Sequence, residues 1–398
     1  MELQGKHIVL GITGGIAAYK AAELCRLLKT NGATVQVVMT EAACRFITPT
    51  TMQALSGLAV YTSQWDNRPD NAMPHINLSR NADAIIVAPA SADFMAQLAL
   101  GLSSDLLALA CLARPIHKCP LLLAPAMNRE MWQHPATQRN VSQVSQDGAI
   151  ILGPVSGDQA CGEEGSGRML QAAEIYQELI SYLQPKTLSG RKLLITAGPT
   201  FEPIDPVRGI TNHSSGKMGF AIARAAQEAG ADVTLIAGPV ALATPRHVRR
   251  IDVISAQQMF DEVMQHVKQH DVFIATAAVA DWRVDTIASQ KIKKTAEGLP
   301  PNLTFTENPD ILAAVAKLPQ PPYCVGFAAE SENLLQHASE KRVRKNISLI
   351  VGNLGPQTFG KDDNQLLLID AQGHKELPRA DKLTLARQLI AEIAQRIK

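Results

Sequence analysis

HIVLGITGG, at residues 7–15, is an apolar run that ends in a Gly-rich turn. An Ala-rich helical pattern follows it, and after Gly32 the chain returns to a second apolar run at residues 35–38. This succession is typical of the opening unit of a nucleotide-binding α/β domain, where glycines let the backbone approach a phosphate at a helix N-terminus. LLITAGPT, at residues 193–200, starts the same pattern again. Two strand–helix–strand units of this kind, each opening a domain, predict two domains and two sites.

Apolar runs between helical stretches predict the sheet of each domain. In the first half they lie at residues 84–88 and 121–124, with one long helical segment expected between them, ending at Ala113. Continuous runs of this kind are typical of parallel strands buried on both faces. In the second half, strands are expected near residues 193–197, 233–237, 272–276, 323–327 and 348–351, followed by a hairpin over 365–373 and a closing helix from Asp381. We therefore expect an α/β protein with two doubly wound, Rossmann-like domains whose sheets are mainly parallel.

Pro185 and Gly190 interrupt a helical pattern just before the second opening. Proline and glycine mark linkers between domains, so we place the boundary near residue 187, with domains at 1–187 and 188–398.

The composition excludes several classes of partner. The 398 residues are 46% hydrophobic and 19% charged, with a net charge of +1, which gives no overall attraction to nucleic acid or to an anionic membrane. Acidic residues and Pro89 interrupt the low-charge stretch 82–113 before it reaches the roughly 18 apolar residues of a membrane span. The six cysteines have no Cys-x-x-Cys or metal-ligand spacing, which favours free thiols and a cytoplasmic protein.

Polar segments at the ends of the predicted strands indicate the first site. The glycines at 11, 14 and 15 do not follow the G-x-G-x-x-G spacing, so they favour a single phosphate over a pyrophosphate, although a plain tight turn would explain them as well. PASAD at 89–93 and PAMNREMW at 125–132 each follow a buried strand directly, and His75 precedes the first of them. Ligands of open α/β sheets collect at the carboxyl ends of the strands, so we expect one site at this edge.

These segments resemble the motifs of the flavin-dependent cysteine decarboxylases, with Asp93 in place of the family's Asn and a complete match over 125–132. The resemblance implies a flavodoxin-like flavoprotein domain, with His75 beside the flavin and Asn128 holding the substrate carboxylate. It implies that FMN binds through Thr13, Gly14, Gly15, Thr40 and Ser91. The Gly-rich stretch 156–169 resembles the family's mobile substrate flap, so the substrate-binding residues are expected to be Asn128, Met131, Arg168 and Met169.

The chemistry explains why these residue types are needed. A cysteine carboxylate has no electron sink for the carbanion left by CO₂, but oxidation of its thiol to a thioaldehyde by FMN creates one. His75 would assist deprotonation of the thiol, and the neutral amide of Asn128 would orient the carboxylate. Cys161, in the flap, is the candidate acid for the late proton transfer. Taken singly, such a His is usually structural, such an Asn a turn residue and such a Cys part of a core.

The connection between Gly198 and Gly216 indicates the second site. Such connections are usually about 2 to 6 residues long, and one about three times longer is expected to be functional. SSGK at 214–217 does not complete a P-loop, because Thr211 and Met218 replace the first glycine and the hydroxyl residue of that pattern. What remains is a helix N-terminus that suits an anion cradle and a helix cap equally.

Later segments occur in an order that resembles phosphopantothenate–cysteine ligase, the domain that bacteria fuse behind the decarboxylase. They are ATAAVADW at 275–282, KIKK at 291–294, NPDI at 308–311 and GFAAE at 326–330, followed by Lys341 and Lys345, which are four apart and share a helix face.

The resemblance to the ligase implies that CTP activates the 4′-phosphopantothenate carboxylate as an acyl-cytidylate, from which the amine of L-cysteine displaces CMP. Asn212 would hold the acyl-cytidylate, Lys291 would stabilise charge, and Asp281 would bind Mg²⁺ at the triphosphate. The residues expected to contact CTP are Ala275, Thr276, Ala277, Asp281, Lys291, Asn308, Pro309, Asp310, Ile311, Phe327, Lys341 and Lys345.

The sequence therefore predicts a bifunctional enzyme of coenzyme A biosynthesis. By resemblance it is a homo-oligomer with trimeric decarboxylase contacts and dimeric ligase contacts, forming a dodecamer, with no nucleic-acid or membrane partner. One alternative is a nicotinamide-dependent oxidoreductase, which the missing G-x-G-x-x-G and the lack of a clear ribose-binding acid disfavour. Another is a non-catalytic flavoprotein regulatory subunit, against which His75, Asn128 and Cys161 together argue.

Overall fold

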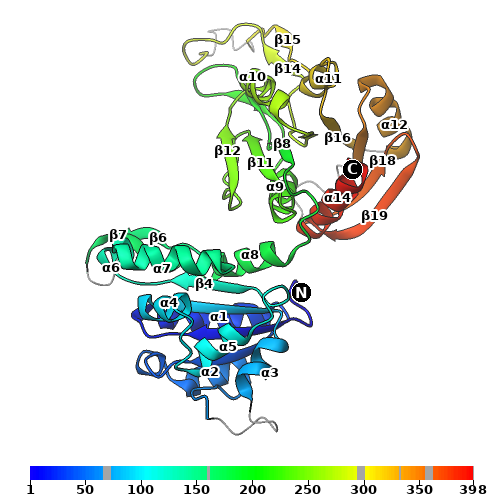
Figure 1. Ribbon diagram of the computed structural model, residues 1–398. Coiled ribbons are helices and arrows are strands. Elements are labelled where there is room, and N and C mark those ends of the chain that lie inside the picture. The colour runs from blue at the N-terminus through cyan, green and yellow to red at the C-terminus, as the bar shows by residue number, and fades with distance from the viewer. Residues whose placement is uncertain (66–72, 159–161, 294–300, 331–332, 355–361, 398) are drawn as a thin grey trace. The chain divides into compact units, whose positions relative to one another are not determined.

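The structure is a computed structural model of the chain. It describes residues 1–65, 73–158, 162–293, 301–330, 333–354 and 362–397. They divide into two compact units, Met1–Leu183 and Gln184–Lys398. Each unit is a sheet covered by helices (Figure 1).

A parallel sheet of five strands lies at the centre of the first unit, in the order β2-β1-β3-β4-β5. Its strands are β1 (His7–Ile12), β2 (Thr34–Met39), β3 (Ala84–Ala90), β4 (Leu121–Pro125) and β5 (Ala149–Ile151). This is the flavodoxin-like order, in which the direction of winding reverses between β1 and β3. The doubly wound fold predicted for this half is confirmed.

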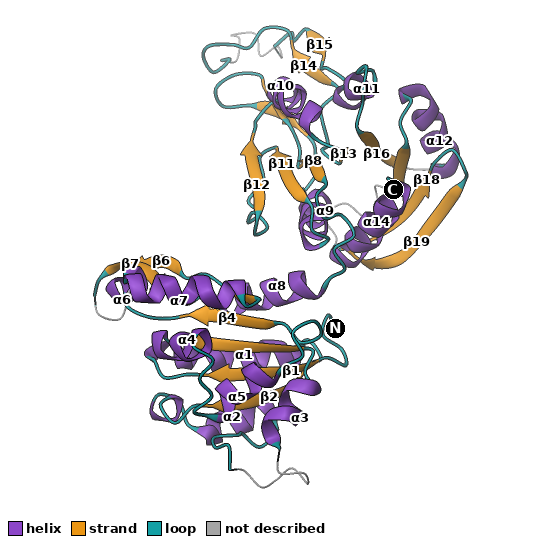
Figure 2. Ribbon diagram, viewed as in Figure 1, coloured by secondary structure: helices purple, strands orange, loops and turns teal. Residues whose placement is uncertain are grey.

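Helices cover both faces of this sheet (Figure 2). One face packs against α1 (Tyr19–Thr30), α2 (Pro49–Ser56) and α8 (Ala172–Leu183). The other packs against α3 (Pro74–Arg80), α4 (Ala92–Ala99), α5 (Leu106–Ala113) and α7 (Pro135–Gln146). The long helical segment predicted to end at Ala113 is wrong, because Asp105 starts a separate helix: its Oδ1 accepts a hydrogen bond from the N–H of Ala108 at 2.9 Å.

Shorter elements complete the first unit. They are the 3₁₀ turns η1 (Ile16–Ala18) and η2 (Ala43–Arg45), helix α6 (Arg129–Gln133), and the antiparallel hairpin of β6 (Val155–Asp158) and β7 (Glu164–Arg168). The hairpin contains part of the predicted flap and packs against α6.

The second unit has an eight-stranded sheet in the order β12-β11-β8-β13-β16-β17-β18-β19. The first six strands run parallel, in the Rossmann order, and the last two are antiparallel. The strands are β8 (Lys192–Ala197), β11 (Asp232–Ala237), β12 (Val248–Asp252), β13 (Val272–Ala275), β16 (Tyr323–Glu330), β17 (Leu349–Leu354), β18 (Asp363–Ile369) and β19 (His374–Asp381). The five predicted strands and the predicted hairpin are confirmed, whereas β12 is an additional edge strand.

Helices also cover both faces of the second sheet. One face packs against α9 (Lys217–Glu228) and α14 (Lys382–Arg396), and the other against α10 (Ala256–His266), α11 (Ile311–Ala316) and α12 (Leu334–Lys345). The predicted closing helix is confirmed, and Asp381 caps it by accepting a hydrogen bond from the N–H of Thr384 at 2.9 Å. The remaining elements are η3 (Val267–Gln269) and two small antiparallel pairs, β9 (Phe201–Pro203) with β10 (Gly209–Thr211) and β14 (Trp282–Val284) with β15 (Phe305–Glu307).

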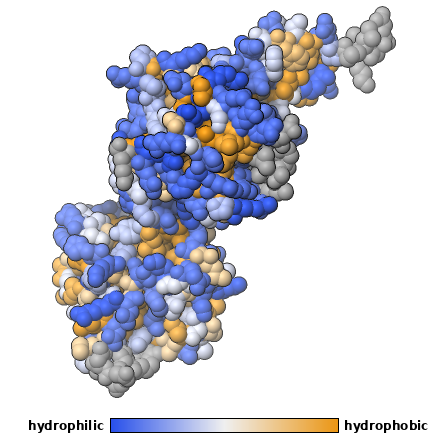
Figure 3. Space-filling model, turned by 90° about the vertical axis from the view of Figure 1, so that its right-hand side faces the viewer, coloured by the Kyte–Doolittle hydropathy of each residue, from blue (hydrophilic) through white to orange (hydrophobic). Residues whose placement is uncertain are grey.

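Hydrophilic residues predominate on the face shown in Figure 3, with hydrophobic residues gathered in patches between them. Among the helices that the structure describes, none has both the length and the apolar character needed to cross a bilayer. The five cysteines within the described residues are free thiols, and Cys161 lies outside those residues.

Candidate functional site

The first candidate site lies where β1 and β3 end. Thr13 is buried directly after β1; its Oγ1 donates to the carbonyl of Pro89 at 2.8 Å and accepts from the N–H of Ser91 at 2.9 Å. It thereby joins the Gly-rich turn to PASAD. A Cβ at Gly14 would lie 2.7 Å from the Cβ of Ala42, whereas Gly15, with φ of 156°, has open space where a Cβ would be. The turn is therefore closed on one side and open on the other.

The open side fits an anion. Gly15 is the N-cap of η1, which leads into α1, and no side chain caps either N-terminus. The first N–H groups of this helical segment therefore remain for a ligand. Thr40 and Ser91 stand at the same sheet edge, and each hydroxyl accepts a backbone N–H, from Ala43 and Phe94 respectively, at 3.2 Å. Each hydroxyl keeps its proton for donation to another acceptor.

His75 lies in the first turn of α3, partly exposed. Its carbonyl accepts a hydrogen bond from the hydroxyl of Ser79 at 2.8 Å. No hydrogen bond within the described residues joins its imidazole to the Gly-rich turn.

Asn128 follows β4 and starts α6, where its Oδ1 accepts from the N–H of Glu130 at 2.8 Å. Its Nδ2 donates to a carboxylate oxygen of Glu163, just before β7, at 2.6 Å. The N–H of Met127 donates to the carbonyl of Gly167 at 3.0 Å, so the flap hairpin is docked on the PAMNREMW segment. The amide of Asn128 is thus already placed to bind a carboxylate.

The other predicted substrate residues lie around this hairpin. Met131 is 49% exposed, and Arg168 is exposed at the end of β7. Met169 is buried, and its carbonyl accepts from Nζ of Lys20 at 3.1 Å. Burial and then the nearby charge of Arg168 lower the pKa of Lys20. Sequence reasoning missed Lys20, although a lysine at a buried position of an Ala-rich helix is itself a signal.

Two adjoining cavities open at the carboxyl ends of the parallel strands in the second unit. Their volumes are about 320 and 380 Å³, and both are lined by Ala277, Val279, Phe327 and Lys341. They lie beside the β8–β13 pair, where the strand order reverses, which is the usual place for a ligand in such a sheet.

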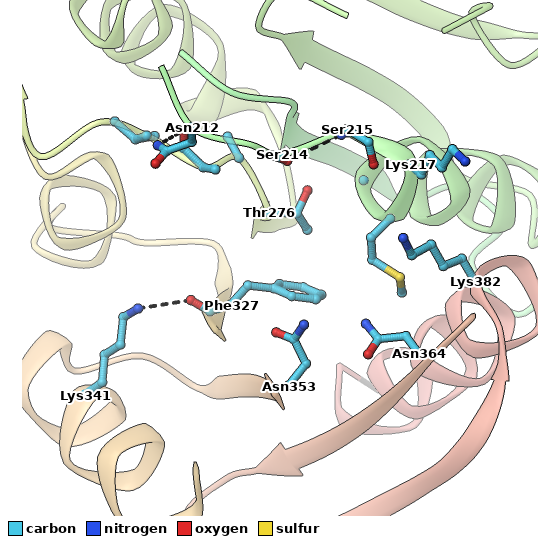
Figure 4. Close-up of a pocket in the computed structure, with 16 residues that line it drawn as sticks. Asn212, Ser214, Ser215, Lys217, Thr276, Phe327, Lys341, Asn353, Asn364 and Lys382 are labelled. Atoms are coloured by element: carbon cyan, nitrogen blue, oxygen red, sulfur yellow. Dashed lines mark hydrogen bonds between the residues drawn. The ribbon is translucent and has the colours of Figure 1, made fainter. Parts of the chain in front are cut away.

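The smaller cavity faces the N-terminus of α9 (Figure 4). Gly216, with φ of 72°, is the N-cap, and no side chain caps the helix. The hydroxyl of Ser214 accepts instead from the N–H of Gly216 at 3.3 Å. Because SSGK does not cap α9 through a side chain, the geometry favours the anion cradle over the helix cap.

Further polar side chains line this cavity from distant parts of the chain. Asn212 is held by a 2.9 Å hydrogen bond from its Nδ2 to the carbonyl of Ala278, and Thr276 donates to the carbonyl of Thr196. Figure 4 also shows Lys217, which belongs to the SSGK segment, and three polar lining residues that sequence reasoning missed: Asn353, Asn364 and Lys382. They belong to α9, β17, β18 and α14, which meet only in the folded sheet.

The two lysines among these residues, Lys217 and Lys382, lie close to one another. Burial and then the charge of Lys217 lower the pKa of Lys382. Nζ of Lys217 donates to Oδ1 of Asp362 at 2.6 Å. Asp362 does not line the cavity, whereas Lys217 and Lys382 both do, so the lining at this end is basic.

The larger cavity collects most of the predicted nucleotide residues. Those that line it are Ala275, Ala277, Asp281, Asn308, Pro309, Asp310, Ile311, Phe327, Lys341 and Lys345. Nδ2 of Asn308 donates to the carbonyl of Ala280 at 2.8 Å, which fixes the NPDI turn. Nζ of Lys341 donates to the carbonyl of Phe327 at 3.1 Å, and Lys345 pairs with Asp310 at 2.9 Å.

Lys291 stands apart from both cavities: it is exposed and lines neither. Asp281 lines the larger one, but the described residues contain no group of three or more His, Cys, Asp or Glu side chains that could hold a metal. A Mg²⁺ ion held here by Asp281 would need ligands from substrate phosphates and water, which is a common arrangement for this ion.

Comparisons with known proteins match the two halves of the chain separately. The family described as Flavoprotein matches residues 1–184, and the family described as DNA/pantothenate metabolism flavoprotein C-terminal domain matches residues 188–397. The chain is 50% identical over 400 residues to the coenzyme A biosynthesis bifunctional protein CoaBC of Haemophilus influenzae, covering 100% of this chain and 99% of the relative. It is 48% identical over 402 residues to the protein of the same name from Escherichia coli K12, covering 100% and 98%.

Among solved structures, the crystal structure of the C-terminal domain of a coenzyme A biosynthesis bifunctional protein CoaBC is 38% identical, covers 53% of this chain and 98% of that chain, and has a TM-score of 0.46. With half of its residues shared over the full length of a curated relative, and with both of its halves matched by family, the chain belongs to the family of bifunctional coenzyme A biosynthesis proteins.

Proposed function

We propose that this chain makes 4′-phosphopantetheine in two steps. The ligase domain, residues 188–398, joins 4′-phosphopantothenate to L-cysteine with CTP. The decarboxylase domain, residues 1–187, then removes CO₂ from 4′-phosphopantothenoylcysteine with FMN. The observation that carries the proposal is the presence of two helix N-termini without side-chain caps, each at the ligand-binding edge of its own sheet.

The residues around Thr13 fit the phosphate of FMN. The space beside Gly15, the free N–H groups of the first helical turn and the hydroxyl protons of Thr40 and Ser91 are suited to phosphate oxygens. When bound, FMN supplies the two-electron oxidation of the substrate thiol and the return of those electrons after CO₂ has left.

The protein side chains then handle the carboxylate and the protons. Asn128 holds the substrate carboxylate through Nδ2, the atom that donates to Glu163 in this structure. His75 accepts the thiol proton at the start of the reaction. Cys161, outside the described residues, donates the late proton to carbon.

The ligation is a two-step substitution. A carboxylate oxygen of 4′-phosphopantothenate attacks the α-phosphorus of CTP and pyrophosphate leaves; the cysteine amine then attacks the acyl carbon and CMP leaves. Both steps concentrate negative charge, which the basic end of the smaller cavity at Lys217 and Lys382 favours. Asn212 offers a neutral amide to the acyl-cytidylate, and Asp281 binds Mg²⁺ with the triphosphate. Lys291, which lines neither cavity in this structure, turns toward the bound triphosphate to stabilise the developing charge.

We also infer that the chain works as a homo-oligomer, with trimeric contacts between decarboxylase domains and dimeric contacts between ligase domains, together a dodecamer. Exposed large apolar side chains support such contacts in each unit: Ile16, Tyr19 and Phe46 in the first and Trp282 and Phe305 in the second.

Crossed single variants test the two-step proposal. Lys291→Gln should slow ligation on the order of 100- to 1000-fold, as expected when one group that stabilises transition-state charge is lost, and should leave CO₂ release and FMN content unchanged. His75→Asn should instead slow CO₂ release and leave ligation unchanged. The assays follow CMP and pyrophosphate from CTP, 4′-phosphopantothenate and cysteine, and CO₂ from 4′-phosphopantothenoylcysteine. Wild-type ligation by Lys291→Gln at saturating CTP would show that this lysine belongs to a solvated basic surface.

A further inference from the structure

The turn between β9 and β10 contains a carboxylate that is shielded from solvent. The side chain of Asp205 is 0% exposed. Its Oδ1 accepts the backbone N–H groups of Val207 and Arg208, at 2.8 and 2.9 Å. Its Oδ2 accepts from the guanidinium of Arg208, through Nε at 3.0 Å and through Nη2. The two oxygens thus have different roles, one within the turn and one outside it.

The outer oxygen also reaches a distant part of the chain. The N–H of Ile292 donates to Oδ2 of Asp205 at 3.2 Å, and the carbonyl of Ile292 accepts from Nη2 of Arg208 at 2.9 Å. Both backbone groups of one residue are therefore held by a single ion pair. Residues 291–293 form neither helix nor strand, so these bonds supply the restraint that a regular element would otherwise provide.

Formation of the turn does not explain this arrangement. An Asp side chain that accepts the N–H groups two and three residues later is sufficient to shape a turn, and an exposed one does so as well. Burying a carboxylate is unfavourable unless it is paired and hydrogen-bonded. The hydrogen bonds from Arg208 hold the pKa of Asp205 well below its usual range, so it remains charged at neutral pH.

Asp205 and Arg208 together form a clamp on the backbone of Ile292. This clamp joins two segments that the ligation requires. Strand β10 ends at Thr211, directly before Asn212, which lines the smaller cavity. The held residue, Ile292, directly follows Lys291. The β9–β10 hairpin and the lysine segment are therefore coupled through Asp205 and Arg208.

We propose that Asp205, with Arg208 as its partner, is a positioning residue: by holding Ile292 it fixes the base of the segment from which Lys291, exposed and outside both cavities here, turns toward the bound nucleotide during ligation. The proposal rests on the role given to Lys291 above. Asp205 acts through the backbone of Ile292 and contacts no substrate.

Asp205→Asn tests the roles of the two carboxylate oxygens separately. The amide oxygen of Asn can still accept the N–H groups of the turn, whereas its NH₂ would face the donors of Arg208 and Ile292. We expect ligation to slow at least 10-fold while CO₂ release and the circular dichroism spectrum stay at wild-type values. Amide hydrogen exchange at Ile292 should accelerate. Asp252→Asn, which removes an exposed carboxylate paired with Arg250 in the same unit, is the matched control and should change none of these.

The double variant Asp205→Asn with Lys291→Gln decides whether Asp205 acts through Lys291. If it does, the double variant ligates no more slowly than Lys291→Gln alone. If the fold-losses in ligation rate of the two single variants multiply in the double variant, the proposal is overturned in favour of a structural role. Ligation at the wild-type rate by Asp205→Asn, together with slow ligation by Lys291→Gln, would also overturn it. Wild-type ligation by Lys291→Gln would instead refute the proposed function of Lys291, and the positioning role with it, while faster exchange at Ile292 would still report the clamp.

Discussion

Asp310 serves both a helix and a cavity wall. Its Oδ1 accepts the N–H of Ala313 at 3.0 Å at the start of α11, and its carboxylate pairs with Lys345. Burial opposes its charged form, but these two interactions outweigh burial and lower the pKa of Asp310. A carboxyl group with a lowered folded-state pKa adds stability above its unfolded pKa, about 3.9, and this contribution is lost as the pH falls through the folded-state value.

The pair makes the stability of the protein sensitive to acid. Asp310→Asn keeps an N-cap side chain but loses the charge that faces Lys345. We expect it to lower stability by up to about 1 kcal/mol near pH 7, because the pair is partly exposed, and to make no difference at a pH well below 3. Calorimetry of the full chain between pH 2 and 7 measures this difference, with Asp252→Asn as a control for the loss of one charge. A deficit that does not depend on pH would contradict the assignment.

At the scale of an element, Ser91 has two roles that can be separated. It caps α4 by accepting the N–H of Phe94, and it stands at the edge proposed for the FMN phosphate. Ser91→Ala should lower the stability of the apoprotein by about 1 kcal/mol, the usual effect of losing an N-cap. Ser91→Asp keeps a cap of similar quality but places a negative charge toward the phosphate.

We therefore expect Ser91→Asp to unfold near the wild-type temperature as apoprotein, yet to bind FMN at least 10-fold more weakly. Flavin absorbance at equilibrium dialysis measures binding, and thermal unfolding without FMN measures the cap, since bound flavin would itself raise stability. Full FMN content in Ser91→Asp would show that Ser91 is only a helix cap.

At the scale of the whole molecule, each unit has its own core. The hydrophobic clusters that cover the two faces of each sheet contain residues of that unit alone. Fragments 1–187 and 188–398 should therefore fold separately, the first binding FMN and releasing CO₂ and the second consuming CTP. Assays across a range of protein concentrations would detect a need for oligomers. An insoluble fragment 1–187 in excess FMN, at every concentration, would argue against independent domains.

Most of the fold could be predicted because its strands are buried on both faces. Runs such as residues 84–88 have no alternating pattern and stand out between helices, as parallel strands do. Strand β12 was missed because it lies at an edge and carries Arg249 and Arg250 in its middle. The break between α4 and α5 was missed although Gly101 and the cap residue Asp105 mark it, because helical apolar patterns lie on both sides of them and resemble one continuous helix.

The local sequence pattern establishes the strand–helix–strand unit that opens each domain, the apolar strands and the motifs that resemble known families, since each of these depends on residues that are neighbours in the sequence. Which remote side chains share a wall depends on strand order. Lys217, Asn353, Asn364 and Lys382 meet because β17 and β18 follow β16 across the sheet and α14 packs against α9 on one of its faces. Likewise, Asp205 reaches Ile292 only after the β9–β10 hairpin folds toward residues 291–293. Contacts between distant segments arise from the packing of whole elements, and local sequence patterns do not encode them.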